Sequence, residues 1–306
     1  MAKPYAAEMA RLAETFAWAG DVDIGALRRA IRAAGGMPLR AVGSGGSLTA
    51  AHALARLHQY VTRQLGVVAT PLDVTEPSAE PLANWLLSAG GSNVDILGAA
   101  RKLANQEPRQ LAILCGRPDS PLCDLARAHP FVDLLLFPPP AGKDGFLATN
   151  SLLGFVAVLV RAYLLELGRV EEWEVVRASI APLLGAGSAQ IENWAATTEP
   201  LWSRSTTIVL HDADSRIGAI DLESKFTEAA VGNLQIADYR NFAHGRHHWL
   251  AKHGDTSAVL ALYSPTGADL AERTLALLPS EIPIARLGLP GSSMGTMLAS
   301  LIAAFQ

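Results

Sequence analysis

The sequence predicts an α/β protein built from two halves, each with a parallel sheet that helices cover on both faces. Short apolar runs alternate with longer helical patterns along the 306 residues. Turns rich in glycine and serine separate several of these runs from the helical stretch that follows, and the order of strand, turn and helix starts afresh in the second half. Strands that alternate with helices form parallel sheets through right-handed crossovers.

The composition indicates a compact globular protein, since half of the residues are hydrophobic and 18% are charged. A formal net charge of -4 gives no general attraction to a phosphate backbone, so we expect no nucleic-acid partner. Two cysteines are too few for a disulfide framework or a four-thiolate zinc site. The first 20 residues lack the apolar core and cleavage site of a signal peptide. We therefore expect a cytoplasmic location.

The first half contains four predicted strands. One apolar run ends at Val42 and passes through a glycine turn into a helix that begins near Ser47, and the run to Leu87 repeats this form. "RQLAILC" and "VDLLLF" predict the third and fourth strands. The stretch "SLLGFVAVLVRAYLLEL" is about as long as a short membrane span, but it contains Arg161 and Glu166. We interpret it as a buried helix and expect no membrane association.

The second half opens after a helical stretch that Pro182 is expected to break. "STTIVLH", "TSAVLALY" and "IPIARLG" predict further strands, and "GSSMGTMLASLIAAFQ" a closing helix. The predicted organisation is an N-terminal helical segment over 1–22, a first domain over 23–168, a helical connector over 169–200 and a second domain over 201–306.

The turn "VGSGGS" has the properties of an anion site. Its glycines let the backbone turn tightly, and Ser44 and Ser47 place hydroxyls beside the free N–H groups of the following helix. Such a helix N-terminus attracts anions, typically a phosphate. The spacing matches neither the dinucleotide fingerprint nor the nucleotide phosphate loop, which excludes both nucleotide classes. A strand-to-helix turn capped by Ser47, with no ligand, is the alternative.

A second turn of small polar residues spans 88–93, also at the carboxyl end of a predicted strand. Ligands in open α/β sheets bind at such ends, so two of these turns side by side are expected to enclose one anionic group. The candidate residues are Ser44, Gly45, Ser47, Ser88, Gly91, Ser92 and Asn93.

These two turns, together with "DLESKFTEAA" and "NFAHGRHHWL", resemble the sugar isomerase (SIS) domain family. The resemblance covers most of the chain. It implies a double SIS domain, which is a pair of flavodoxin-like, three-layer α/β/α domains with parallel sheets. It also implies a phosphosugar ligand, no cofactor, and a homodimer with shared active sites.

The resemblance assigns catalytic roles to three residues. The family pattern places an acidic residue, a lysine and a glutamate on one helix, which Asp221, Lys225 and Glu228 match; His244 and Gly245 match a downstream His-Gly. Glu228 is implied as the base that moves a proton between C1 and C2 of the open-chain sugar, and His244 as the group that assists ring opening. A carboxylate or an imidazole held close to its proton is suited to these tasks. A solvated salt bridge between Lys225 and Glu228 is the alternative.

Several positions depart from the family pattern. Asn241 stands three residues before His244, where the family pattern has a glutamate. Ala89, Gly90 and Asn93 occupy places where the family's second turn carries larger polar or hydroxyl side chains, and the tail "LASLIAAFQ" has no counterpart of a family lysine. The sequence shows neither a glutamine-hydrolysing domain nor an amino-terminal cysteine, so we expect no glutaminase activity. The expected function is a phosphosugar aldose–ketose isomerase, deglycase or deaminase. The alternative is a sugar-phosphate-binding or regulatory protein without turnover.

Four histidines between residues 244 and 253 raise the alternative of a metal site. Gly245 weakens the helix that would align His244 with His248, and Arg246 would repel a cation, so we expect no metal. Arg240 and Arg246 fit an anionic ligand or an acidic partner subunit, since guanidinium groups match phosphate and carboxylate. "HDADSR" at 211–216 is interpreted as a turn over a ligand or an interface rather than a magnesium site.

Overall fold

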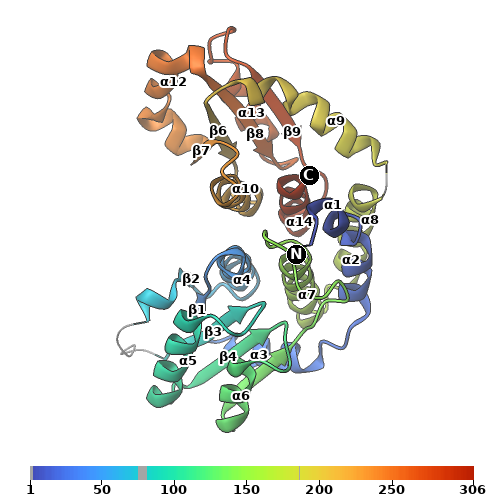
Figure 1. Cartoon of the computed structure of the whole chain (residues 1–306), viewed down its shortest axis with the longest axis vertical. Helices are drawn as coiled ribbons and strands as arrows, with labels where there is room; N and C mark the ends of the chain where they lie inside the picture. The colour runs from blue at the N-terminus through green and yellow to red at the C-terminus, as the bar shows by residue number, and fades with distance from the viewer. Residues whose placement is uncertain (1–2, 75–80, 186) are drawn as a thin grey trace. The chain divides into compact units, whose positions relative to one another are not determined.

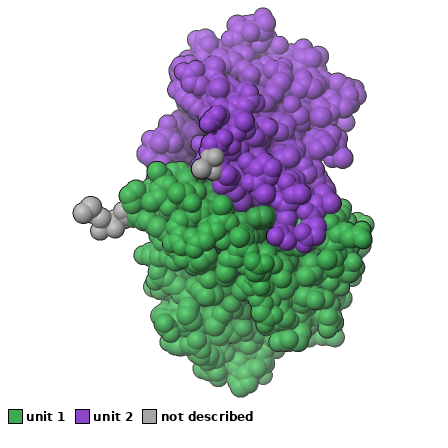
Figure 2. Space-filling view, turned by 90° about the vertical axis from the view of Figure 1, so that its right-hand side faces the viewer, with its two compact units in different colours: residues 1–173 green, residues 174–306 purple. Residues whose placement is uncertain are grey.

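The computed structural model describes residues 3–74, 81–185 and 187–306. The chain forms two compact units, residues 1–173 and residues 174–306 (Figure 2). Each unit contains one sheet of parallel strands flanked by helices (Figure 1), as the sequence predicts.

The sheet of the first unit has five strands in the order β2-β1-β3-β4-β5. The strands are β1 (Leu39–Val42), β2 (Gly66–Ala69), β3 (Ala83–Ser88), β4 (Gln110–Cys115) and β5 (Val132–Leu136). β3 and β4 are buried along their whole length because helices cover both faces of the sheet, and this explains their continuous apolar runs.

The helices of the first unit are α1 (Tyr5–Met9), α2 (Leu12–Asp21), α3 (Gly25–Ala34), α4 (Gly46–Thr62), α5 (Val94–Gln106), α6 (Pro121–Ala128) and α7 (Asn150–Glu166), with a short 3₁₀ helix, η1 (Pro71–Asp73). α2, α3 and α4 all pack against α7. α5 and α6 pack against each other and share a core cluster with β1, β3 and β4. Helix α8 (Val170–Leu184) runs across the division between the units.

The sheet of the second unit has four strands in the order β7-β6-β8-β9. The strands are β6 (Thr206–His211), β7 (Asn233–Asp238), β8 (Ser257–Tyr263) and β9 (Ile284–Gly288). The helical elements are α9 (Ala189–Thr198), η2 (Glu199–Ser203), α10 (Arg216–Glu228), α11 (Tyr239–Asn241), η3 (Phe242–Arg246), α12 (His248–His253), η4 (Gly254–Thr256), α13 (Ala268–Leu275) and α14 (Ser293–Phe305). α10 packs closely on α14, where a Cβ at Gly218 would lie 2.2 Å from the backbone oxygen of Ser300.

Two sequence-based expectations about these elements are wrong. β2 and β7 are absent from the predicted strands, and both lie at sheet edges with part of their length exposed. Pro182 does not break a helix, because α8 continues through it to Leu184. Within the described residues, no helix is long and apolar enough to cross a membrane.

Candidate functional site

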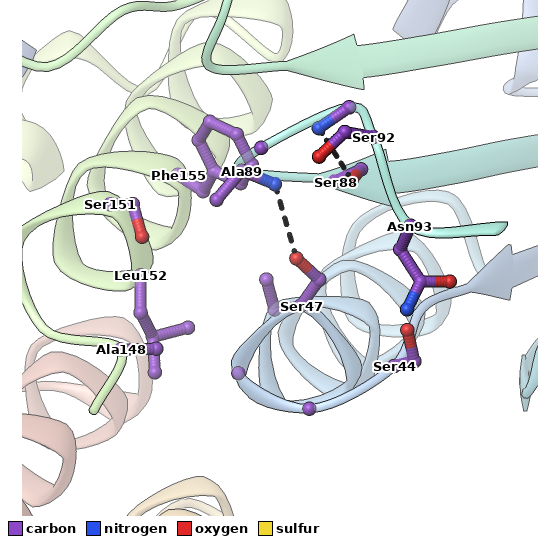
Figure 3. A pocket seen from close by; sticks show the side chains of 15 residues that line it. Ser44, Ser47, Ser88, Ala89, Ser92, Asn93, Ala148, Ser151, Leu152 and Phe155 are labelled. Carbon is purple, nitrogen blue, oxygen red and sulfur yellow. Dashed lines mark hydrogen bonds between the residues drawn. The ribbon is translucent and has the colours of Figure 1, made fainter. Parts of the chain in front are cut away.

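A pocket of about 360 Å³ lies in the first unit, between the turns that follow β1 and β3 (Figure 3). The structure brings all seven predicted phosphosugar-binding residues to its wall: Ser44, Gly45, Ser47, Ser88, Gly91, Ser92 and Asn93. Its volume falls within the range of small-molecule sites.

The topology of the sheet explains why the pocket forms there. β1 and β3 are adjacent parallel strands, paired from Leu39 with Ala83 to Val42 with Leu86. The chain leaves β1 toward β2 on one side and leaves β3 toward β4 on the other. Their connections therefore diverge, which opens a crevice at the carboxyl ends of the two strands.

The first turn delivers the start of α4 to the pocket. Gly45 has a φ of +53°, a left-handed conformation that favours glycine, and it precedes the first helical residue, Gly46. No side chain caps this helix end, and the N–H groups of Ser47 and Leu48 donate to the backbone carbonyls of Ser44 and Gly45. The hydroxyl of Ser47 accepts a hydrogen bond of 3.3 Å from the backbone N–H of Ala89, which joins the first turn to the second (Figure 3).

The second turn depends on Gly91, whose φ is +63°. A Cβ there would lie 2.2 Å from the hydroxyl oxygen of Ser120, so no larger residue fits without a shift. The hydroxyl of Ser88 accepts from the N–H of Gly91 at 3.0 Å. The side-chain oxygen of Asn93 caps α5 by accepting from two backbone N–H groups, and its amide nitrogen points toward Ser44 (Figure 3).

A third wall of the pocket comes from the start of α7 and was not predicted. Ala148, Ser151, Leu152 and Phe155 line it. A Cβ at Gly46 would lie 2.1 Å from the Cβ of Ala148, so the approach of this segment to α4 requires glycine. The only signal in the sequence is the polar "TNS" before an apolar helix, and it does not show which turns that helix faces.

Buried and partly buried carboxylates hold this third wall in place. Asp144 accepts hydrogen bonds from the backbone N–H groups of Thr149, Asn150 and Ser151 at the start of α7. Glu8, which is 1% exposed on α1, accepts from the Gly145 N–H and the Thr149 hydroxyl. The N-terminal helix therefore positions the loop that borders the pocket.

The described lining of this pocket contains no charged side chain. An anion there would be held by hydroxyls, by backbone N–H groups and by the partial positive charge of helix N-termini. This arrangement suits a phosphate group, and the affinity of such a site should depend only modestly on ionic strength.

The predicted catalytic residues all lie in the second unit. Lys225 and Asp221 form a buried ion pair of 2.5 Å, one turn apart on α10, and the Lys225 ammonium lies 4.6 Å from the ring centroid of Phe305. The alternative of a solvated salt bridge between Lys225 and Glu228 is therefore wrong. Glu228 is exposed at the last position of α10, where its carboxylate accepts a 3.0 Å hydrogen bond from the Ser224 hydroxyl.

His244 is exposed within an irregular segment after β7. Gly245 has a φ of +132°, so the segment is not a regular helix and does not align His244 with His248 one turn apart. In the part of the chain that the structure describes, no group of three or more histidine, cysteine, aspartate or glutamate side chains is arranged to hold a metal ion.

The stretch at 211–216 forms a turn that is held by hydrogen bonds from within it and from Ser264. The Asp212 carboxylate accepts from Ser215 and from both the N–H and the hydroxyl of Ser264. Burial acts to raise the pKa of Asp212, but these hydrogen bonds outweigh it and hold the pKa below its ordinary value. Since the chain's own donors occupy this carboxylate, it is a structural group.

Comparison with solved structures identifies the fold. The C-terminal domain of glucosamine-fructose-6-phosphate aminotransferase from Francisella tularensis matches with a TM-score of 0.73 at 14% identity, over 99% of this chain and 94% of that one. Tagatose-6-phosphate ketose/aldose isomerase from Escherichia coli matches with a TM-score of 0.72 at 15% identity, over 100% and 94%. This chain has the sugar isomerase domain fold.

Glucosamine-6-phosphate deaminase from Thermotoga maritima has a related arrangement, with a TM-score of 0.62 at 14% identity over 88% of this chain and 84% of that one. No protein-family model and no curated protein matches this sequence. The structural matches therefore establish the sugar isomerase fold. Sequence identities of 14–15% do not establish the activity.

Proposed function

We propose that this protein binds a phosphosugar in the pocket of the first unit and acts on it as an aldose–ketose isomerase, or as a deglycase or deaminase of related chemistry. The observation that carries the proposal is the convergence of the two serine–glycine turns on one pocket at the diverging crossovers of the sheet. The phosphosugar isomerases and deaminase among the structural neighbours support the substrate class.

The proposed reaction is a proton transfer on the open-chain sugar. The Glu228 carboxylate takes the proton from C2 of an aldose, the C2–H electron pair becomes the C1–C2 double bond, and the carbonyl oxygen is protonated to give an enediol. Return of a proton to C1, with loss of the C2 hydroxyl proton, gives the ketose. Such a base must be within reach of the carbon it deprotonates.

We assign His244 to ring opening, where its imidazole exchanges a proton with the ring oxygen. Lys225 enters the proposal as a positioning residue, because its ammonium is buried against Asp221 and fixes the face of α10 that precedes Glu228. The exposure of His244 supports a homodimer in which this side chain reaches a neighbouring subunit's site. Two free, buried cysteines support a reducing, cytoplasmic location.

Binding without turnover is the second candidate, and particular residues favour it. Glu228 is exposed and accepts a hydrogen bond from Ser224, and Ala89 and Gly90 contribute no side-chain hydroxyl to the second turn. A protein of this kind would sense or store a sugar phosphate while keeping the pocket.

A ligand screen followed by isotope exchange separates the two candidates. Hexose and hexosamine phosphates are first tested by thermal shift, and each hit is incubated in D₂O with the protein while the C2 proton signal is followed by NMR. Loss of that signal in wild type and its retention with Glu228→Gln supports the isomerase. Exchange that persists in Glu228→Gln contradicts the assigned base, and binding without exchange in wild type favours the non-catalytic protein.

The matched control is Glu223→Gln, which removes a second carboxylate from the same helix. Glu223 accepts only a 3.4 Å hydrogen bond from Thr227 among the described residues, so its loss changes the charge of α10 without touching the assigned base. C2 exchange in this variant is expected to equal that of wild type.

A further inference from the structure

A second pocket, of about 520 Å³, lies in the second unit at the carboxyl ends of β6 and β7. Three arginines line it: Arg216 at the start of α10, Arg240 in α11 and Arg246 at the end of η3. Arg216 belongs to the turn at 211–216, and Arg240 and Arg246 to the histidine-rich stretch. Of these two stretches, only His244 has a role in the proposed reaction.

These three arginines are not neutralised by the chain itself. Within the ranges that the structure describes, none of them makes a side-chain hydrogen bond or an ion pair with another residue. The two carboxylates on the pocket wall, Asp212 and Asp238, are occupied by other donors. Asp212 accepts from Ser215 and Ser264.

Asp238 caps α11 by accepting from the backbone N–H groups of Arg240 and Asn241 and from the Asn241 amide. Burial acts to raise the pKa of Asp238, but these hydrogen bonds outweigh it and keep the carboxylate ionised. The pocket therefore has three arginine side chains without a bonded partner among the described residues, while its two carboxylates already accept hydrogen bonds from other groups. The arginines are available to bind an anion.

A buried imidazole also lines this pocket. His211, at the last position of β6, is 6% exposed and lines the same pocket. Its Nδ1 lies 2.9 Å from the carbonyl oxygen of Asp212, which can only accept, so Nδ1 carries the proton. Burial lowers the pKa of His211, which favours the neutral ring. Its Nε2 is then an acceptor, and it makes no hydrogen bond with another described residue.

Donors and acceptor together define a class of ligand. Guanidinium groups bind phosphate through paired N–H groups, whereas a neutral Nε2 repels a bare oxyanion but accepts a hydrogen bond from a hydroxyl. We propose that this pocket is a second binding site, which takes a small hydroxylated phosphate ester through Arg216, Arg240 and Arg246 while His211 accepts from a ligand hydroxyl. The described lining of the pocket in the first unit contains no cationic side chain, and the second site is argued from other residues than the proposed function.

Two probes of nearly equal size test the assignment by calorimetry on the full chain. Glycerol 3-phosphate carries two hydroxyls, and propyl phosphate carries none. We expect glycerol 3-phosphate to bind more tightly than propyl phosphate. Its affinity should fall as sodium chloride is added, since salt screens exposed guanidinium groups. Replacing each arginine in turn (Arg216→Gln, Arg240→Gln, Arg246→Gln) should lower the affinity for both probes by about tenfold.

Arg273→Gln is the matched control, because it removes the same charge from the surface of the same unit. Arg273 pairs with Asp269 through an exposed contact of 3.4 Å and lies outside the pocket. Its binding of both probes should equal that of wild type. His211→Phe should abolish the preference for glycerol 3-phosphate, and histidine-selective NMR should show the His211 ring signal shift when that probe is added to wild type.

Two outcomes overturn the proposal, and the first has a variant that names another role for the arginines. One is unchanged binding in all three arginine variants, and another is the absence of binding heat with either probe. If binding is unchanged and the sedimentation of the arginine variants differs from wild type, these side chains belong to a contact with a second copy of the chain. Ser88→Ala, which alters only the pocket of the first unit, distinguishes these results from a failure of the proposed function.

Discussion

The Ser47 hydroxyl accepts a hydrogen bond from the backbone N–H of Ala89 at 3.3 Å, so a side chain in the first turn of α4 fixes the turn that follows β3. Ser47 therefore supports the pocket and also lines it. Ser92 differs, since it lines the pocket while exposed and makes no hydrogen bond within the described residues.

This difference predicts two distinct phenotypes. Ser47→Ala leaves the Ala89 N–H without its acceptor, so it should lower the free energy of unfolding by about 1 kcal/mol and also weaken phosphosugar binding. Ser92→Ala should weaken binding and leave the free energy of unfolding unchanged. Urea denaturation and calorimetry on both variants check this, and equal stability loss in the two would contradict the role of Ser47.

Gly91 is expected to tolerate no side chain. Gly91→Ala combines a left-handed φ with a Cβ 2.2 Å from the Ser120 hydroxyl, so it should cost more than about 2 kcal/mol of stability and abolish phosphosugar binding. Gly98→Ala is the control, since Gly98 lies in α5 and a Cβ added there would meet nothing within 4 Å. It should stabilise the protein by about 0.5–1 kcal/mol. A Gly91→Ala protein as stable as wild type would refute the packing described for the second turn.

The buried pair of Lys225 and Asp221 should behave as a unit. Lys225→Met removes the ammonium that balances a carboxylate 2% exposed, which should destabilise the protein by about 3–5 kcal/mol. Adding Asp221→Asn should recover part of that loss, because the uncompensated charge is then gone. Thermal denaturation of the two single variants and the double variant gives the coupling energy. Strictly additive losses would show that the two side chains do not stabilise each other.

His58 predicts an acid-sensitive first unit. Its Nε2 lies 2.9 Å from the Met37 carbonyl and its Nδ1 3.1 Å from the Tyr163 hydroxyl, so the neutral ring donates to the first and accepts from the second. Burial lowers the pKa of His58 below its ordinary value of 6.5, against a smaller opposing effect of the Met37 carbonyl.

The unfolded chain therefore takes up a proton near pH 6.5 that the folded chain does not, and stability falls as the pH drops below that value. The free energy of unfolding should be constant from about pH 8 to 7 and decrease toward about pH 5.5, by at most about 1.4 kcal/mol per pH unit for this group. His211, whose pKa burial also lowers, adds to the trend. Urea denaturation at several pH values should show that the free energy of unfolding depends less on pH in His58→Gln than in wild type. An identical pH dependence would contradict the buried neutral ring.

The sequence predicts the buried strands and both turns of the pocket, because continuous apolar runs followed by glycine and serine are local signals. β2 and β7 lie at sheet edges, where exposure removes that signal. The contribution of Ser151 and Phe155 depends on the packing of α7 against α4, which is a long-range contact. Similarly, Lys225 has possible partners on either side along its helix, and only burial selects Asp221 over Glu228.

A crystal structure of the protein soaked with a hexose 6-phosphate that it binds tests the phosphosugar pocket of the first unit most directly. We expect phosphate density between residues 44–47 and 88–93, within hydrogen-bond distance of Ser44, Ser47 or Ser88 and of backbone N–H groups. Phosphate density elsewhere on the chain at full ligand occupancy, with this pocket holding only water, would contradict it.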